Sequence, residues 1–364
     1  MRLPRLFPRT AVLLSATVLG AGGAAADPAD RLAHALLDRS GAPAAGVALW
    51  SEDGARTSVA GRRVAGQAVP VEAGDLWHVG SNTKSMTATL VARLAEAGRI
   101  GWDDTVGQVL GPVIADIHPA YRDATYVALL QHRAGLPANI GWFASLRLLG
   151  SAEGRDLIAD RRSYAARVLS RAPVADPAGF AYSNAGYVVA GAMLEQTTGE
   201  SWESLMRAEV FAPLGLDSAG FGPPGRRGAA DQPRGHRKGL TGALRAVEPG
   251  PVADNVPALG PAGTVHLSLA DMLDYLTAHA RPDTGFLSAE SWARLHTPPE
   301  GGSYAMGWNV SDDGRLGHSG SNTLWFARMA VWPETNRALF LVVNAGGMDR
   351  LPKVMDEVQA RAFD

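Results

Sequence analysis

Ser81 and Lys84, three residues apart in Gly80-Ser81-Asn82-Thr83-Lys84, are the first candidates for chemistry. A serine hydroxyl is a weak nucleophile unless a neighbouring base takes its proton, and a helix places Lys84 one turn after Ser81 on the same face. A lysine held in a desolvated pocket loses its proton near neutral pH and can be that base. The start of the helix also offers unpaired backbone N–H groups to a developing oxyanion. Taken alone, the spacing fits a helix-surface Ser and Lys equally well.

The scarcity of lysine favours the catalytic interpretation. Among 34 Lys plus Arg residues, only Lys84, Lys238 and Lys353 are lysines. Arginine does not deprotonate in proteins and therefore cannot serve as a base. One of the few lysines follows a serine that would open a helix, so Ser81 and Lys84 are the candidate nucleophile and base.

Tyr182-Ser183-Asn184 forms a second polar segment, placed just before an apolar helical pattern. A phenol can relay a proton, and an amide can hold a substrate carbonyl or a lysine. Without other evidence, however, the favoured interpretation of this segment is a turn with a helix N-cap.

Gly317-His318-Ser319-Gly320 forms a third segment, just before a strand-rich region. Its small residues would let a substrate backbone lie along a sheet edge, with His318 facing it. In isolation the segment is better explained as a polar strand end with a surface histidine.

The elements that would position these segments follow from periodicity and turn residues. Helices are expected at 27–39, 81–97, 164–169, 187–197, 201–211, 268–279 and 351–362, and strands at 46–51, 56–60, 326–332 and 338–344. Residues 218–263 are dense in Gly and Pro, and such a long irregular segment is usually functional or mobile.

This order of elements predicts an α+β fold. Strands at both ends of the chain would build one sheet with helices on its face, and the middle of the chain would form a helical lobe. The expected sheet lobe comprises about 27–80 and 264–364, and the helical lobe with its loops about 81–263.

Composition excludes several classes of protein. Apolar residues make up 46% and charged residues 19% of the chain, which is typical of a globular protein. The net charge of −2 gives no basic surplus for nucleic acid. With no cysteine there is no thiolate nucleophile or Cys-zinc site, and no His-Glu-x-x-His spacing predicts a metal. We therefore expect neither a metal nor a cofactor, and the missing Gly-x-Ser-x-Gly elbow argues against an α/β-hydrolase.

The first 26 residues have the layout of a secretory signal peptide. Arg2, Arg5 and Arg9 precede an apolar stretch at 11–19, and small residues at 24–26 precede Asp27. We expect an exported, periplasmic or secreted chain that keeps no membrane span after the signal is removed. The alternative is a short N-terminal membrane anchor, which we consider less favoured because the apolar stretch is shorter than a bilayer-spanning helix requires.

The order and spacing of the three polar segments resemble the serine β-lactamase and penicillin-binding-protein superfamily. The resemblance extends to Leu129-Leu130-Gln131-His132-Arg133-Ala134-Gly135-Leu136-Pro137, to Tyr304-Ala305-Met306-Gly307-Trp308 and to the closing hairpin, and covers about 27–364. The nearest branch contains class C β-lactamases, D-alanyl-D-alanine carboxypeptidases and related esterases. It implies an antiparallel sheet flanked by the N- and C-terminal helices, with a second, mainly helical lobe.

The resemblance also implies roles for individual residues. Ser81 would be the acylated nucleophile, Lys84 its base and Tyr182 the proton relay. Asn184 would contact the substrate or the lysine, and His318 and Gly320 would contact the substrate. The N–H groups of Ser81 and Ser321 would form the oxyanion hole. Two departures stand out: His318 and Ser319 replace a common Lys-Thr pair, which weakens any claim of efficient antibiotic hydrolysis, and Ala134 replaces a serine in what we interpret as a structural position.

These observations predict a serine hydrolase that acts through a Ser81 acyl-enzyme on a small ester or a D-amino-acid peptide or amide, including cell-wall-derived substrates. The alternatives are a true class C-like β-lactamase and a non-catalytic penicillin-binding sensor that is acylated once. His318 could bind a substrate carboxylate as a cation or act as a neutral hydrogen-bond partner. We favour the neutral role, because a plain imidazole is mostly uncharged near neutral pH.

Overall fold

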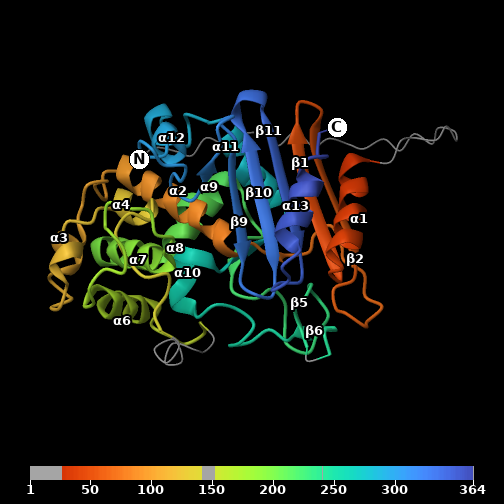
Figure 1. Ribbon diagram of the computed structural model, residues 1–364, viewed down its shortest axis with the longest axis horizontal. Coiled ribbons are helices and arrows are strands. Elements are labelled where there is room, and N and C mark those ends of the chain that lie inside the picture. Colours follow the sequence, from red (N-terminus) through yellow and green to blue (C-terminus); the bar gives the residue numbers. More distant parts are fainter. Residues whose placement is uncertain (1–26, 142–151, 240, 364) are drawn as a thin grey trace, which may run out of the picture.

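The computed structural model describes residues 27–141, 152–239 and 241–363 (Figure 1). The predicted signal segment lies outside the described residues. Along the part of the chain that is described, no helix is long and apolar enough to cross a membrane.

A six-stranded antiparallel sheet joins the two ends of the chain, in the order β2-β1-β11-β10-β9-β8. Both predicted hairpins are confirmed. The first is formed by β1 and β2, and the second by β10 and β11, with β10 at the expected residues Phe326–Trp332. The strands of this sheet are β1 (Ala44–Ser51), β2 (Gly54–Gly61), β8 (Asn309–Val310), β9 (Leu316–Ser321), β10 (Phe326–Trp332) and β11 (Arg337–Val343).

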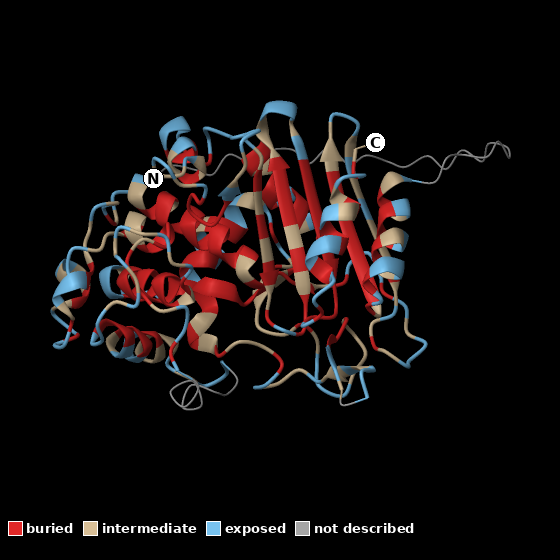
Figure 2. Cartoon of the chain, viewed as in Figure 1, coloured by how far each residue is buried: buried red, intermediate tan, exposed pale blue. Residues whose placement is uncertain are grey.

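Both faces of the sheet are buried, as the side chains of strand β11 illustrate. Its side chains alternate: Leu339, Leu341 and Val343 pack on one side with helices α1 and α13, while Phe340 and Val342 face the opposite core. Since successive side chains of a strand point to opposite faces, this unbroken apolar run suits a strand covered on both sides. Figure 2 shows the central strands buried along most of their length.

The predicted helices are present, with two differences. The helix predicted at 164–169 already begins at Leu157, and the one predicted at 201–211 is divided into α8 and a π-helical turn. The Asp27 carboxylate caps the first helix by accepting from the Ala29 N–H at 2.8 Å, and Gly41 closes it in the left-handed conformation. The α-helices are α1 (Pro28–Ser40), α2 (Thr83–Glu96), α3 (Val106–Leu110), α4 (Tyr126–Leu130), α6 (Leu157–Leu169), α7 (Asn184–Thr198), α8 (Trp202–Met206), α9 (Ala212–Leu214), α10 (Gly260–Gly263), α11 (Leu269–Ala280), α12 (Ala289–His296) and α13 (Leu351–Gln359).

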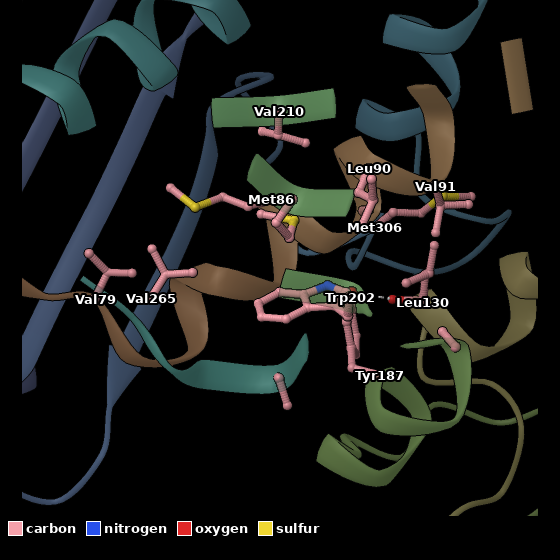
Figure 3. Packing of buried hydrophobic residues seen from close by; sticks show 14 of the residues in the cluster. Val79, Met86, Leu90, Val91, Leu130, Tyr187, Trp202, Val210, Val265 and Met306 are labelled. Carbon is pink, nitrogen blue, oxygen red and sulfur yellow. Dashed lines mark hydrogen bonds between the residues drawn. The ribbon is translucent and has the colours of Figure 1, made fainter. Parts of the chain in front are cut away.

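Helix α2 runs through the middle of the larger core, between the sheet and helices α4 and α7 (Figures 1 and 3). Met86, Leu90 and Val91 are fully buried on it. On the neighbouring α7, the Tyr187 hydroxyl donates to the Leu130 carbonyl at 2.8 Å, which ties α7 to the end of α4. The sheet built from both ends of the chain and the helices around α2 confirm the predicted α+β architecture.

The Gly- and Pro-rich segment 218–263 holds more regular structure than its sequence predicts. β4 pairs with β7 in a small sheet that also contains β3, and β5 and β6 form a hairpin. The segment ends in α10, which packs against α2 and α7. These strands are β3 (Trp77–His78), β4 (Gly220–Phe221), β5 (Gly235–Lys238), β6 (Leu244–Val247) and β7 (Val265–Leu267).

A buried cluster of charged residues connects helices α6, α7 and α8. Arg161 of α6 is fully buried and donates to Glu195 of α7 at 2.6 Å and to Glu203 of α8 at 2.6 Å. Its guanidinium also reaches the Pro257 carbonyl, just before α10, at 3.5 Å. Burial raises the pKa of the Glu195 carboxyl, and Arg161 opposes that shift.

Replacing Arg161 with Ala should lower the free energy of unfolding by about 3–5 kcal/mol, because two largely buried carboxylates would lose their counter-charge. The matched control is Arg226→Ala. Arg226 pairs with Asp231, but its side chain is 83% exposed, so that loss should be between about 0 and 1 kcal/mol. Chemical denaturation of both variants measures the difference, and equal losses would show that burial does not set the strength of the Arg161 cluster.

Candidate active site

Ser81 lies on a 3₁₀ turn, Gly80–Asn82, directly before helix α2. The turn is held by the Thr83 hydroxyl, which donates to the Gly80 carbonyl at 2.7 Å. Gly80 has φ +54°, and a Cβ atom there would overlap the backbone nitrogen of Ser321. Glycine is therefore required both by the backbone conformation and by the close approach of strand β9.

Lys84 is fully buried in the first turn of α2, and its Nζ contacts three oxygen atoms. Nζ lies 3.1 Å from Ser81 Oγ, 2.7 Å from Asn184 Oδ1 and 2.7 Å from the Ala262 carbonyl oxygen. Ser81 and Lys84 therefore lie together at the start of α2, as their spacing predicts. The third contact comes from α10, at the end of the Gly- and Pro-rich segment.

Burial lowers the pKa of the Lys84 amine well below its ordinary value. The surroundings are aromatic: Nζ lies 5.0 Å from the ring centre of Tyr182 and 5.5 Å from that of Tyr187. Removal from water disfavours the ammonium form and favours the free amine, which is the form that can accept a proton.

Tyr182 and Asn184 flank the Ser183 N-cap of α7. The Ser183 hydroxyl accepts from the Gly186 N–H at 2.9 Å and donates to the Pro137 carbonyl at 2.6 Å. The predicted N-cap is confirmed. Because the cap fixes where the helix begins, Tyr182 and Asn184 on either side of it lie next to Lys84. Asn184 is held further by its Nδ2, which donates to Asn139 Oδ1 at 3.0 Å.

The Tyr182 phenol faces the site although the residue as a whole is 37% exposed. Burial raises the pKa of Tyr182 to about 12, and its hydrogen bond with Ser81 acts against that rise. The phenol therefore keeps its proton at neutral pH. Beneath it lies His132, whose ring centre is 4.4 Å from that of Tyr182 and whose Nδ1 accepts from the Ser183 N–H at 3.1 Å.

Strand β9 passes directly beside the serine turn. A Cβ atom on Gly320 would overlap the Val79 carbonyl oxygen and lie 2.7 Å from the Ser81 backbone nitrogen. The Ser321 hydroxyl is committed elsewhere, since it donates to the Trp325 carbonyl at 2.7 Å and accepts from the Thr323 N–H at 3.0 Å. Ser321 can therefore serve the site through its backbone and not through its side chain.

His318 lies on the inner face of β9 and is 5% exposed. Its Nε2 is 3.1 Å from the Tyr304 hydroxyl, and its ring centre is 6.2 Å from that of Tyr182. Burial, reinforced by the positive charge that Lys84 carries when protonated, lowers the pKa of His318 to about 3. The imidazole is neutral at any ordinary working pH.

The structure brings together every residue proposed for the site from sequence: Ser81, Lys84, Tyr182, Asn184, His318, Gly320 and Ser321. Sequence reasoning did not find Ala262 or the role of Tyr304. Ala262 contributes only a backbone carbonyl, which leaves no trace in residue type. Tyr304 belongs to a segment that the resemblance included, and its partner His318 could have indicated a nearby hydroxyl.

The resulting arrangement joins a serine hydroxyl, a buried amine with a lowered pKa and a protonated phenol in one place. These are the parts needed for nucleophilic attack, removal of a proton and its return to a leaving group. Backbone nitrogens at Ser81 and Ser321 lie beside the same turn, as an oxyanion-binding site requires.

Comparisons with known proteins identify the family of this chain. The family model described as Beta-lactamase matches residues 29–362. Penicillin-binding protein 4 of Amycolatopsis lactamdurans is 29% identical over 331 residues, which cover 86% of this chain and 83% of that protein.

Solved structures show the same fold at low sequence identity. The D-amino acid amidase from Ochrobactrum anthropi SV3 in complex with L-phenylalanine amide aligns with a TM-score of 0.72 at 22% identity, over 91% of this chain and 96% of that one. EstCE1, a hydrolase with promiscuous acyltransferase activity, aligns with a TM-score of 0.72 at 18% identity, over 92% and 97%. This chain belongs to the β-lactamase family, within the serine β-lactamase and penicillin-binding-protein superfamily of serine hydrolases.

Proposed function

We propose that this protein hydrolyses a small ester or a D-amino-acid amide or peptide through an acyl-enzyme on Ser81. The observation that carries the proposal is the fully buried Lys84 amine, 3.1 Å from the Ser81 hydroxyl. A serine is a good nucleophile only when a base of this kind is within reach.

The contacts of Lys84 explain how it acts as the base. An uncharged amine has two N–H groups and one lone pair. Asn184 Oδ1 and the Ala262 carbonyl, both at 2.7 Å, accept the two N–H groups. The lone pair is then directed to Ser81, where it accepts the hydroxyl proton as Oγ attacks the substrate carbonyl.

Tyr182 completes the proton transfer. Attack forms the bond between Ser81 Oγ and the carbonyl carbon, and the carbonyl electron pair moves onto its oxygen. When the tetrahedral intermediate collapses, the bond to the leaving alkoxide or amine breaks. The phenol, whose pKa is about 12, gives its proton to the leaving group and regains one from the Lys84 ammonium. Water then repeats the sequence and releases the acid.

The oxyanion is stabilised by backbone groups. The backbone nitrogens of Ser81 and Ser321 lie close to the contact between the serine turn and β9. In this proposal, their N–H groups bind the carbonyl oxygen of the substrate. Losing one such donor typically costs about 10²–10³ in kcat.

The substrate class follows from His318 and from the relatives. A neutral imidazole offers no fixed positive charge to a substrate carboxylate, which favours esters and amides that lack one. Proteins of this fold include a D-amino acid amidase and a hydrolase with acyltransferase activity. These names describe an amidase and an acyl-transferring hydrolase, so we place small esters and D-amino-acid amides first.

Replacing Ser81 with Ala should lower kcat/KM for an ester by about 10⁴–10⁶, the range seen when a serine enzyme loses its nucleophile. Lys84→Ala should cause a similar loss, and the double variant should be no worse than either single variant because the two residues act as a unit. Steady-state kinetics measures all three. Ser319→Ala is the control, since its hydroxyl accepts from Arg328 at 3.3 Å on the other face of β9, and it should stay within about fivefold of wild type.

Intact-mass measurements separate the proposal from its alternatives. A serine-reactive phosphonate should add to wild type at Ser81 and not to Ser81→Ala; labelling of the variant would identify a different nucleophile. Turnover of β-lactams faster than of esters or D-alanyl peptides would indicate a true β-lactamase. A stable penicilloyl adduct without turnover of any substrate would indicate a penicillin sensor.

The pH profile tests the charge states of Lys84 and His318. Because burial lowers the pKa of Lys84, kcat/KM should fall as pH drops through that value and the amine becomes protonated. His318, with a pKa of about 3, should add no change between about pH 5 and 8, so matched neutral and anionic esters should have parallel profiles. An efficiency that declines with rising pH only for the anionic ester would identify His318 as a cation instead.

We also propose export, which the Arg2, Arg5 and Arg9 cluster and the apolar stretch behind it support. Cleavage before Asp27 would leave the first helix intact, because the Asp27 carboxylate itself caps α1. N-terminal sequencing of protein from the culture medium or periplasm should begin near Asp27. Recovery of the full chain with Met1 from a cytosolic fraction would contradict this proposal.

A further inference from the structure

A buried histidine–aspartate pair lies directly behind the serine turn. His78, the last residue of β3, has its Nε2 2.9 Å from Asp254 Oδ2, and the two side chains are 0% and 5% exposed. Asp254 belongs to the Gly- and Pro-rich segment, so the pair joins parts of the chain that are 176 residues apart.

The contacts of His78 define its tautomer. The Gly80 backbone N–H donates to His78 Nδ1 at 3.1 Å, so Nδ1 must be the unprotonated nitrogen. Nε2 then carries the proton and donates it to the Asp254 carboxylate. Both ring nitrogens are occupied, and neither can take the Ser81 proton. The pair therefore differs from the histidine and aspartate of a catalytic triad, although it consists of the same residue types.

The second carboxylate oxygen of Asp254 contacts the turn that follows strand β9. Oδ1 accepts from Asn322 Nδ2 at 2.9 Å and from the Asn255 backbone N–H at 2.7 Å. Asn322 immediately follows Ser321, and its own Oδ1 caps the turn after β9 by accepting from the N–H groups of Leu324 and Trp325. One carboxylate thus connects the residue before Ser81 to the residue after Ser321.

We propose that His78 and Asp254 are positioning residues that set the spacing of the two oxyanion-hole N–H groups. This inference rests on the proposed acyl transfer. Its physical basis is geometric: oxyanion donors work only when they lie about 2.7–3.1 Å from the developing charge. The Gly80 N–H is fixed by His78 and the turn after Ser321 is fixed by Asn322, and Asp254 holds both. A misplacement of about 1 Å at such a site can cost about 10²-fold.

The test compares folded variants in kcat, KM and affinity for a phenylboronic acid, whose tetrahedral serine adduct imitates the transition state. His78→Gln keeps a donor toward Asp254 and removes the acceptor for Gly80; Asp254→Asn turns one acceptor into a donor facing Asn322. Each should lower kcat and boronate affinity by about 10- to 100-fold, with KM within about threefold. The matched control is His266→Asn, which changes the β7 histidine opposite His78 in register but leaves the Gly80 and Asp254 contacts intact.

A swapped pair distinguishes positioning from a general packing defect. Asp254→Asn combined with Asn322→Asp restores one donor and one acceptor across the same contact, so kcat should recover at least tenfold relative to Asp254→Asn alone. If Asp254→Asn does not fold, Asn322→Ser serves the same purpose. Its hydroxyl can still cap the turn, but it no longer reaches Asp254.

Folded His78→Gln and Asp254→Asn proteins with unchanged kcat and boronate affinity would overturn the inference, as would losses confined to KM. Failure of the proposed function is recognised separately, because wild type itself would then show neither turnover nor phosphonate labelling.

Discussion

The burial of the Lys84 amine inside the protein is the constraint on which this structure depends. Lys84 is fully buried, and its amine is surrounded by the rings of Tyr182 and Tyr187. Such a group is tolerated only when every polar atom it carries has a partner. Asn184 and Ala262 supply the acceptors, and Ser81 occupies the remaining direction. The three contacts that satisfy the hydrogen-bonding groups of the Lys84 amine are therefore the same three that it needs to act as a base.

Those contacts come from elements that are far apart in the chain, so the rest of the fold must keep them in register. The N-cap of α7 fixes Asn184, and the Arg161 cluster connects α6, α7 and α8 to the Pro257 carbonyl just before α10, where Ala262 lies. The sheet brings β9 against the serine turn, where only glycine fits at Gly80 and Gly320. A shift of any one of these elements would separate the amine from its acceptors or the serine from its oxyanion donors.

Sequence predicts the parts of the site that are local or carried by side chains. Ser81 and Lys84 lie one helical turn apart, so their proximity follows from spacing alone, and the hairpins at both ends follow from turn residues. The carbonyl of Ala262 could not be predicted, because any residue has one. The ordinary pKa of histidine already favours a neutral His318 near neutral pH. Most of the lowering of its pKa, however, comes from burial against Tyr304 and near Lys84, which depends on tertiary packing. The strands within 218–263 were missed because they are short and pair with distant partners.

The same burial that makes Lys84 a base opposes folding. In the unfolded chain the amine binds a proton up to about pH 10.4, whereas the folded protein releases that proton at lower pH. Stability therefore rises with pH over the interval between the folded and unfolded pKa values of the amine, because the unfolded chain binds the additional proton there. His132 and His318, whose pKa values are lowered to about 2 and about 3, act in the same direction below the ordinary imidazole range. A site assembled only for stability would place a hydrophobic side chain where Lys84 lies. The extensive core on both faces of the sheet is what allows the chain to keep an amine there in its reactive form.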